Sequence, residues 1–173
     1  FATTVSPWIV TLEALEPFRC PAFARTGDEP RPLPYLFDEA DQRGGGYDIG
    51  TQMTLSSAKM RARKLAPALL SRCSFRDSYW TLAQMVAHQT SNGCNLQPGD
   101  LLGSGTISGT SADGAGSLIE LTQDGKSPIH LPGGETRGFI EDGDEVIQRG
   151  RCEREGAAGI GFGEAAGVVK PAP

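Results

Sequence analysis

The residues between Gly103 and Glu120 have the types and spacing that could bind a small anion and act on it. Glycine allows the backbone N–H groups to approach a ligand closely, and a hydroxyl can donate to an anionic or carbonyl oxygen. Glu120 is the one ionisable side chain in 117–121, which we expect to be a strand. From composition alone, a bulged corner and an exposed strand face would also explain these residues. The corner alternates glycines with hydroxyls: Gly103, Ser104, Gly105, Thr106, Ser108 and Gly109.

The elements beside this corner must position it. Pro98-Gly99-Asp100 predicts a turn, after which Leu101 and Leu102 are expected to begin a buried segment. Before it, residues 74–92 predict the one main helix, which Gly93 ends. Ser74 with Asp77 resembles a capping box at its start. One apolar stripe supports this helix: Phe75, Tyr79, Leu82 and Val86.

The remaining segments favour an α+β, β-rich fold. Alternation over 47–55 predicts a half-buried strand, and 68–74 and 145–152 are also expected to be strands. We expect a short helix over 10–15 capped by Thr11, a long surface segment over 17–46 and a solvated turn over 56–64. After Ser117 we expect successive hairpins, with turns at 124–125, 133–134 and 141–144. In the last turn the acids Asp142, Asp144 and Glu145 lack the spacing of a calcium loop, and we expect them to be solvated. Gly161 and Gly163 are expected to serve close strand packing.

Composition narrows the class of function. The 173 residues are enough for one domain, 1–173, and the net charge of −5 argues against nucleic acid or an anionic membrane as a partner. No apolar run is long enough to span a membrane. The four cysteines have no zinc-ligand spacing and suit a reducing, cytoplasmic compartment. The chain begins at Phe1 rather than Met, so we expect it to be a piece of a longer protein.

Several long strings, in order along almost the whole chain, resemble the C-terminal domain of the fumarylacetoacetase family. The resemblance implies that domain's fold, a mixed β-sandwich roll with one main helix. The strings are Phe1-Ala2-Thr3-Thr4-Val5-Ser6-Pro7-Trp8, Asp28-Glu29-Pro30-Arg31-Pro32-Leu33-Pro34-Tyr35-Leu36, Tyr79-Trp80-Thr81, Asn92-Gly93-Cys94-Asn95-Leu96, Pro98-Gly99-Asp100-Leu101-Leu102, Ser104-Gly105-Thr106-Ile107-Ser108-Gly109, Gly116-Ser117, Glu120-Leu121, Asp142-Gly143-Asp144-Glu145-Val146 and Ile160-Gly161-Phe162-Gly163.

The resemblance implies a specific chemistry. Members of this family hydrolyse a carbon–carbon bond of a β-diketo acid to fumarate and acetoacetate, in tyrosine and phenylalanine catabolism, as cytoplasmic homodimers that use Mg²⁺ and/or Ca²⁺. By position, Glu120 would be the catalytic carboxylate that orients a histidine base, and Thr106 would bind a substrate carboxylate. Thr3 would lie beside the metal ion.

The sequence also departs from the family's full pattern. In the family the histidine base, the carboxylate metal ligands and further substrate-binding residues precede the position of Phe1, and neither His88 nor His130 occupies the base's position. We therefore expect this chain alone to be incomplete and inactive. Two alternatives stay open: an acylpyruvase or decarboxylase of the same superfamily, and an inactive dimerisation or binding fragment.

Overall fold

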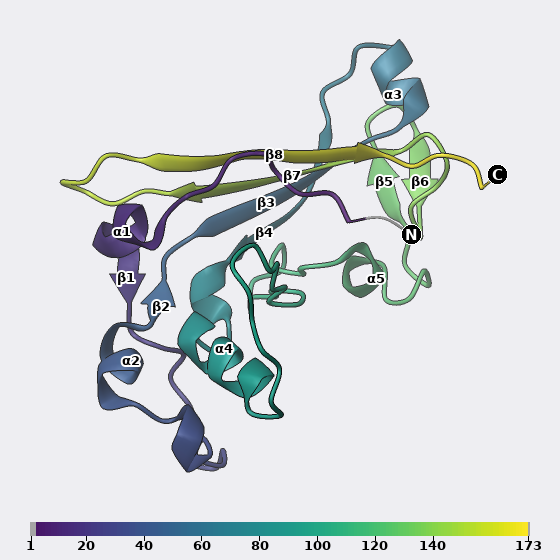
Figure 1. Ribbon diagram of the computed structural model, residues 1–173. Coiled ribbons are helices and arrows are strands. Elements are labelled where there is room, and N and C mark those ends of the chain that lie inside the picture. The colour runs from purple at the N-terminus through teal and green to yellow at the C-terminus, as the bar shows by residue number, and fades with distance from the viewer. Residues whose placement is uncertain (1–2, 173) are drawn as a thin grey trace.

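A four-stranded antiparallel sheet organises the computed structural model, which describes residues 3–172 (Figure 1). Its strand order is β4-β3-β7-β8, with β3 (Gly50–Ser56), β4 (Ala68–Ser74), β7 (Glu145–Cys152) and β8 (Ile160–Val168). Two small antiparallel ribbons accompany it: β1 (Arg19–Cys20) with β2 (Gly46–Tyr47), and β5 (Ile129–Leu131) with β6 (Glu135–Arg137). The predicted α+β class is confirmed, and so are the strands over 68–74 and 145–152 and the turn at 133–134. Within residues 3–172 we find no helix with the length and apolarity that a membrane span requires.

The register of the sheet separates its two faces. Side chains alternate between the faces along each strand. One face, which we call the charged face, carries the paired positions Gln52, Arg72, Arg149 and Glu164. The other, which we call the loop face, carries the paired positions Thr51, Cys73 and Gly150.

Apolar packing is concentrated in two clusters, at opposite ends of the sheet. The first contains buried Leu15, Phe18, Tyr47 and Cys152. The second contains buried Leu55, Met60 and Leu131. Between the clusters most strand residues other than Met53 are polar or small, and few core side chains cover the middle of the sheet. These polar or small residues are Thr51, Gln52, Ser71, Cys73, Gln148 and Gly150.

Short helices surround the sheet. The predicted short helix is confirmed as α1 (Leu12–Leu15), where the Thr11 side chain accepts a hydrogen bond from the Ala14 N–H. The surface segment over 17–46 contains more regular structure than expected. It includes η1 (Glu16–Phe18), η2 (Pro34–Leu36), α2 (Glu39–Gly44) and the ribbon β1–β2.

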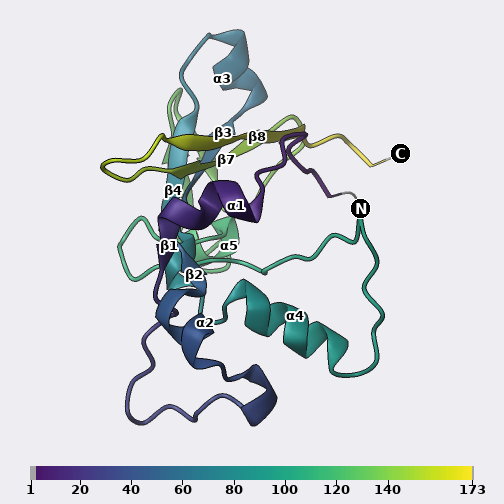
Figure 2. The same cartoon turned by 60° about the vertical axis from the view of Figure 1, so that its left-hand side comes forward.

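The main helix is shorter than the predicted 74–92. A 3-10 turn, η3 (Phe75–Asp77), begins at Ser74, whose side chain caps that turn only. The α-helix α4 (Leu82–Thr90) starts after Thr81, which forms a capping box with Gln84. Thr81 and Gln84 are both buried, so the cap is also a packing contact and it fixes the start of the helix. Both ribbon views show α4 set apart from the four-stranded sheet (Figure 2).

Four local predictions are wrong for identifiable reasons. Residues 58–62 form helix α3 (Ala58–Ala62), because Ser57 caps it and buried Met60 anchors it to the second cluster. Leu101 and Leu102 are 71% and 46% exposed, so no buried segment begins there. The 124–125 turn joins no strands, and follows a short helix instead. Asp144 is fully buried against Arg137 rather than solvated.

The N-terminal segment lies along β8, and glycines of that strand allow its close approach. Ser6 donates a hydrogen bond from Oγ to the Phe162 carbonyl at 2.7 Å. A Cβ placed on Gly163 would lie 2.2 Å from Cδ1 of Trp8, and Gly163 has a φ of +70°. The prediction of close packing is confirmed for Gly163 and is wrong for Gly161, where an added Cβ would meet no atom within 4 Å.

Gly163→Ala is therefore expected to lower the free energy of unfolding by about 1–3 kcal/mol, through the left-handed backbone and the displaced Trp8. Gly161→Ala on the same strand is the matched control, since its added methyl group would meet no atom within 4 Å beyond its chain neighbours. Urea unfolding of both variants measures the difference. Equal stability of the two would contradict the packing role of Gly163.

Candidate functional site

Thr106 lies at the wall of a cavity of about 590 Å³ on the loop face of the sheet. Strand residues of β3, β4 and β7 form the floor of this cavity, including Met53, Ser71 and Gln148. Residues 105–107 form one wall, and Ser6 of the N-terminal segment also lines the cavity. The cavity therefore occupies the stretch of sheet that the two core clusters leave uncovered.

Backbone contacts fasten the segment around Thr106 to the edge strand β4. The Arg72 N–H donates to the Asp113 carbonyl at 2.8 Å, and the Cys73 Sγ donates to the Gly114 carbonyl at 3.2 Å. Gly114 also accepts from the Gly109 N–H at 2.8 Å. These bonds close 109–114 into a turn held on β4, and the flanking residues 105–108 and 116–120 are thereby brought together.

Gly116 allows these two flanks to touch. A Cβ at this position would lie 2.2 Å from the Ile107 carbonyl oxygen and 2.7 Å from Cγ2 of Thr106. No side chain larger than hydrogen fits there without moving the backbone of 106–107. Gly116 thus sets the spacing between Thr106 and the residues that follow Ser117.

Glu120 lies on a short helix, α5 (Leu118–Leu121), and not on the predicted strand. Ser117 starts the helix by accepting from the Glu120 N–H at 3.4 Å. Leu118 is 8% exposed and Thr122 is fully buried, where its hydroxyl donates to the Gly138 carbonyl at 2.8 Å. Burial of these two residues one turn apart selects a helix and leaves Glu120 on its exposed side.

Two serine hydroxyls hold the Glu120 carboxylate. Ser117 donates to Oε2 at 2.9 Å, and Ser108 lies 3.0 Å from both carboxylate oxygens. The hydrogen bonds from Ser117 and then Ser108 hold the pKa of Glu120 below its ordinary value, because they favour the charged form. The Glu120 carboxylate is therefore ionised and is fixed beside Ser108, which follows Thr106 by two residues.

Ser117 belongs to the site although no sequence pattern above assigned it there. A signal was present, since Ser117-x-x-Glu120 has the spacing of a helix start. The apolar neighbours Leu118, Ile119 and Leu121 favoured a strand instead, and that interpretation concealed the contact.

The contacts of Ser108 and Gly116 bring Glu120 close to Thr106, although Glu120 itself is not among the residues that line the cavity. Thr3 is not shown to join them. Thr3 is exposed on the N-terminal segment and is not among the residues that line the cavity, whereas Ser6 is. Within residues 3–172, no group of three or more histidine, cysteine or acidic side chains could hold a metal ion. One threonine hydroxyl is a weak ligand by itself, so the described residues do not fit a Mg²⁺ or Ca²⁺ centre.

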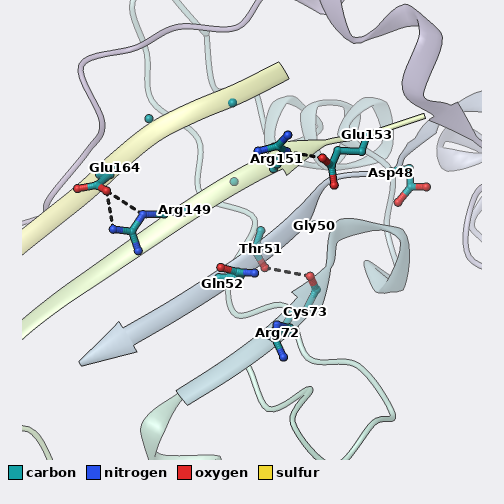
Figure 3. Close-up of a pocket in the computed structure, with 13 residues that line it drawn as sticks. Asp48, Gly50, Thr51, Gln52, Arg72, Cys73, Arg149, Arg151, Glu153 and Glu164 are labelled. Carbon is teal, nitrogen blue, oxygen red and sulfur yellow. Dashed lines mark hydrogen bonds and ion pairs between the residues drawn. The ribbon is translucent and has the colours of Figure 1, made fainter. Parts of the chain in front are cut away.

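A second cavity, of about 860 Å³, opens on the charged face (Figure 3). Its charges are paired: Arg149 with Glu164 at 2.5 Å and Arg151 with Glu153 at 2.7 Å. Figure 3 shows these pairs lying along β7 and β8. It contains none of the three predicted site residues, so the loop face is the better candidate.

An α+β domain with a hydroxyl-bearing corner at the wall of a cavity has the features of a small-molecule binding site that can take an anion. Residues 1–169 match the family model described as "Fumarylacetoacetate (FAA) hydrolase C-terminal". The chain therefore belongs to the fumarylacetoacetate hydrolase family.

Curated relatives agree with this assignment. The chain is 45% identical over 173 residues to fumarylacetoacetase of Arabidopsis thaliana, a match that covers 100% of the chain. It is 45% identical over 172 residues to fumarylacetoacetase of Homo sapiens and 42% identical over 175 residues to that of Dictyostelium discoideum, each covering 99% of the chain. The chain spans about 38% of the length of each of these relatives.

Proposed function

We propose that the intact polypeptide hydrolyses the carbon–carbon bond of fumarylacetoacetate, giving fumarate and acetoacetate. The observation that carries the proposal concerns Thr106 and Glu120, the two residues matched by position to a substrate-binding and a catalytic group. Thr106 lines the cavity, and Ser108, two residues further on, lies 3.0 Å from the Glu120 carboxylate. The names of the relatives support the same reaction.

In the proposed mechanism Glu120 acts on an imidazole rather than on the substrate. Its ionised carboxylate accepts the N–H of the ring, so the other ring nitrogen can take a proton from water. The water oxygen bonds to a carbonyl carbon of the β-diketo acid, and the adjacent C–C bond breaks. The released electron pair leaves as the enolate of acetoacetate, which is then protonated. The Thr106 hydroxyl donates to a carboxylate of the bound substrate.

The imidazole of this mechanism is not one of the two described histidines. Nδ1 of His88 lies 3.1 Å from the Tyr35 hydroxyl, beside η2 and away from the cavity, and His130 is on the ribbon strand β5. We propose that the base, and the carboxylate ligands of Mg²⁺ or Ca²⁺, come from outside residues 3–172. A bound divalent ion would supply positive charge that stabilises the enolate.

Two further properties are proposed with the reaction. We propose a homodimer as the working form. All four cysteines are free, at Cys20, Cys73, Cys94 and Cys152, and this supports a cytoplasmic location, where thiols stay reduced.

The test is an assay of the intact native polypeptide with fumarylacetoacetate in the presence of Mg²⁺ or Ca²⁺. We expect the β-diketone absorbance to decay while fumarate and acetoacetate form in equal amounts. An acylpyruvate and a decarboxylation substrate, each assayed in parallel, distinguish the other activities of the superfamily. Turnover of either one without turnover of fumarylacetoacetate would overturn the proposal.

A further inference from the structure

We propose that Ser108 and Ser117 are positioning residues, whose hydroxyls hold the Glu120 carboxylate in one orientation. This inference rests on the proposed function, because it assigns the two serines to the same site. It adds two residues for which neither the motif resemblance nor the comparisons supply a role.

The backbone fixes the direction in which each hydroxyl donates. The Gly116 N–H donates to the Ser108 oxygen at 3.1 Å, and the Glu120 N–H donates to the Ser117 oxygen at 3.4 Å. Each serine therefore accepts from a backbone group and has its one hydroxyl hydrogen left for the carboxylate. Neither hydroxyl needs to reorient when Glu120 receives a further donor.

The carboxylate keeps room for that further donor. An ionised carboxylate has about four lone-pair positions, and Ser108 and Ser117 approach from the two chain segments that Gly116 brings together. Glu120 is exposed, so its unused positions are open. A third donor, such as an imidazole N–H, can bind to a carboxylate that is already held in place.

Helix stability does not explain the bonds between Ser108 and Glu120, because Ser108 lies outside α5. Leu118 and Thr122 anchor α5 through burial, while the bonds between Glu120 and Ser108 are exposed. A bond between two exposed polar groups adds little to stability. The arrangement costs the side chains conformational freedom and is more easily explained by a requirement for orientation.

The first test follows the Glu120 carboxyl through an NMR pH titration of this chain. We expect its pKa to lie below the ordinary 4.5 and to rise in Ser108→Ala and in Ser117→Ala. Ser104→Ala is the matched control, because that hydroxyl is in the same corner but bonds only to the Gly105 carbonyl. Ser117→Thr, which keeps both the cap and the donor, should restore the original titration. An unchanged Glu120 pKa in Ser108→Ala would overturn the inference.

The second test measures catalysis by the intact native polypeptide. We expect Ser108→Ala and Ser117→Ala to lower kcat roughly 10-fold with little change in KM. Ser91→Ala, whose exposed hydroxyl bonds only to the His88 carbonyl at the end of α4, should match the parent. If Glu120→Gln abolishes turnover while Ser108→Ala behaves like Ser91→Ala, the positioning role fails and the proposed function stands. If Glu120→Gln leaves turnover intact, both fail.

Discussion

Replacement of Asp144 by Ala is expected to lower the free energy of unfolding by about 2–4 kcal/mol, because the buried Arg137 loses its two-point partner. Arg137 would keep only its longer ion pairs, with Glu135 at 3.4 Å and Glu141 at 3.3 Å. Asp144 is fully buried and Arg137 is 7% exposed. The two side chains form a paired contact, with Nε to Oδ2 at 2.8 Å and Nη2 to Oδ1 at 3.0 Å. Asp144 also accepts from the Glu141 N–H at 3.0 Å, so its loss opens the turn before β7.

The control is Glu164→Ala on the charged face. The side chains of Glu164 and its partner Arg149 are 52% and 40% exposed. An ion pair at that exposure contributes about 1 kcal/mol or less to the free energy of unfolding. Urea unfolding of both variants gives the comparison. If Asp144→Ala and Glu164→Ala unfolded at the same urea concentration, the buried ion pair would not make the larger contribution to stability.

Asp144 also illustrates where sequence reasoning ends. The turn at 141–144 was predicted correctly from its acids and its glycine, which are local signals. Which acid is buried depends on Arg137, and that residue comes from the ribbon β5–β6 packed beside the turn. No local pattern contains that contact. The predicted solvation is confirmed for Asp142, which is exposed, and is wrong for Asp144 for this reason.

The helix boundaries were also predicted correctly only where the signal is local in the sequence. Thr11 before α1 was identified as a cap because the cap and the helix are adjacent in sequence. The helix expected over 74–92 was too long, because the apolar stripe continues through 78–80 while buried Thr81 and Gln84 decide where α4 begins. At α5 a strand was predicted where the structure has a helix, because the apolar neighbours of Glu120 outweighed the capping signal of Ser117. Tertiary packing decided each of these cases.

The candidate site was predictable only as a set of residue types. The glycines and hydroxyls of 103–109 indicated a pocket, but nothing local placed Thr106 against Gly116 or Ser108 against Glu120. Those contacts depend on the 109–114 turn being fastened to β4. Roles for Thr106 and Glu120 came from resemblance, and the geometry that brings the two together came from the fold.

Glu120→Gln is expected to lower kcat for fumarylacetoacetate by about 10²–10⁴-fold in the intact native polypeptide. The amide has the shape of the carboxylate, so Ser117 and Ser108 can still approach it and α5 keeps its cap. The negative charge that would stabilise a protonated imidazole is lost, and the neutral amide can turn an NH₂ group toward the ring. KM should change little, because Thr106 and not Glu120 is proposed to bind the substrate. The kinetic constants are measured by fumarate release.

Two further variants make this result specific. Glu164→Gln removes one exposed carboxylate charge on the opposite face and should leave kcat at the parent value. Thr106→Val should instead raise KM, by roughly 10-fold, since it removes a hydrogen bond to a charged carboxylate while leaving the base and Glu120 in place. The two constants then separate the two residues, because loss of Glu120 affects kcat and loss of Thr106 affects KM. If Glu120→Gln raised KM alone, as Thr106→Val is expected to do, Glu120 would belong to substrate binding. The orientation of a base would then have to be assigned to another carboxylate.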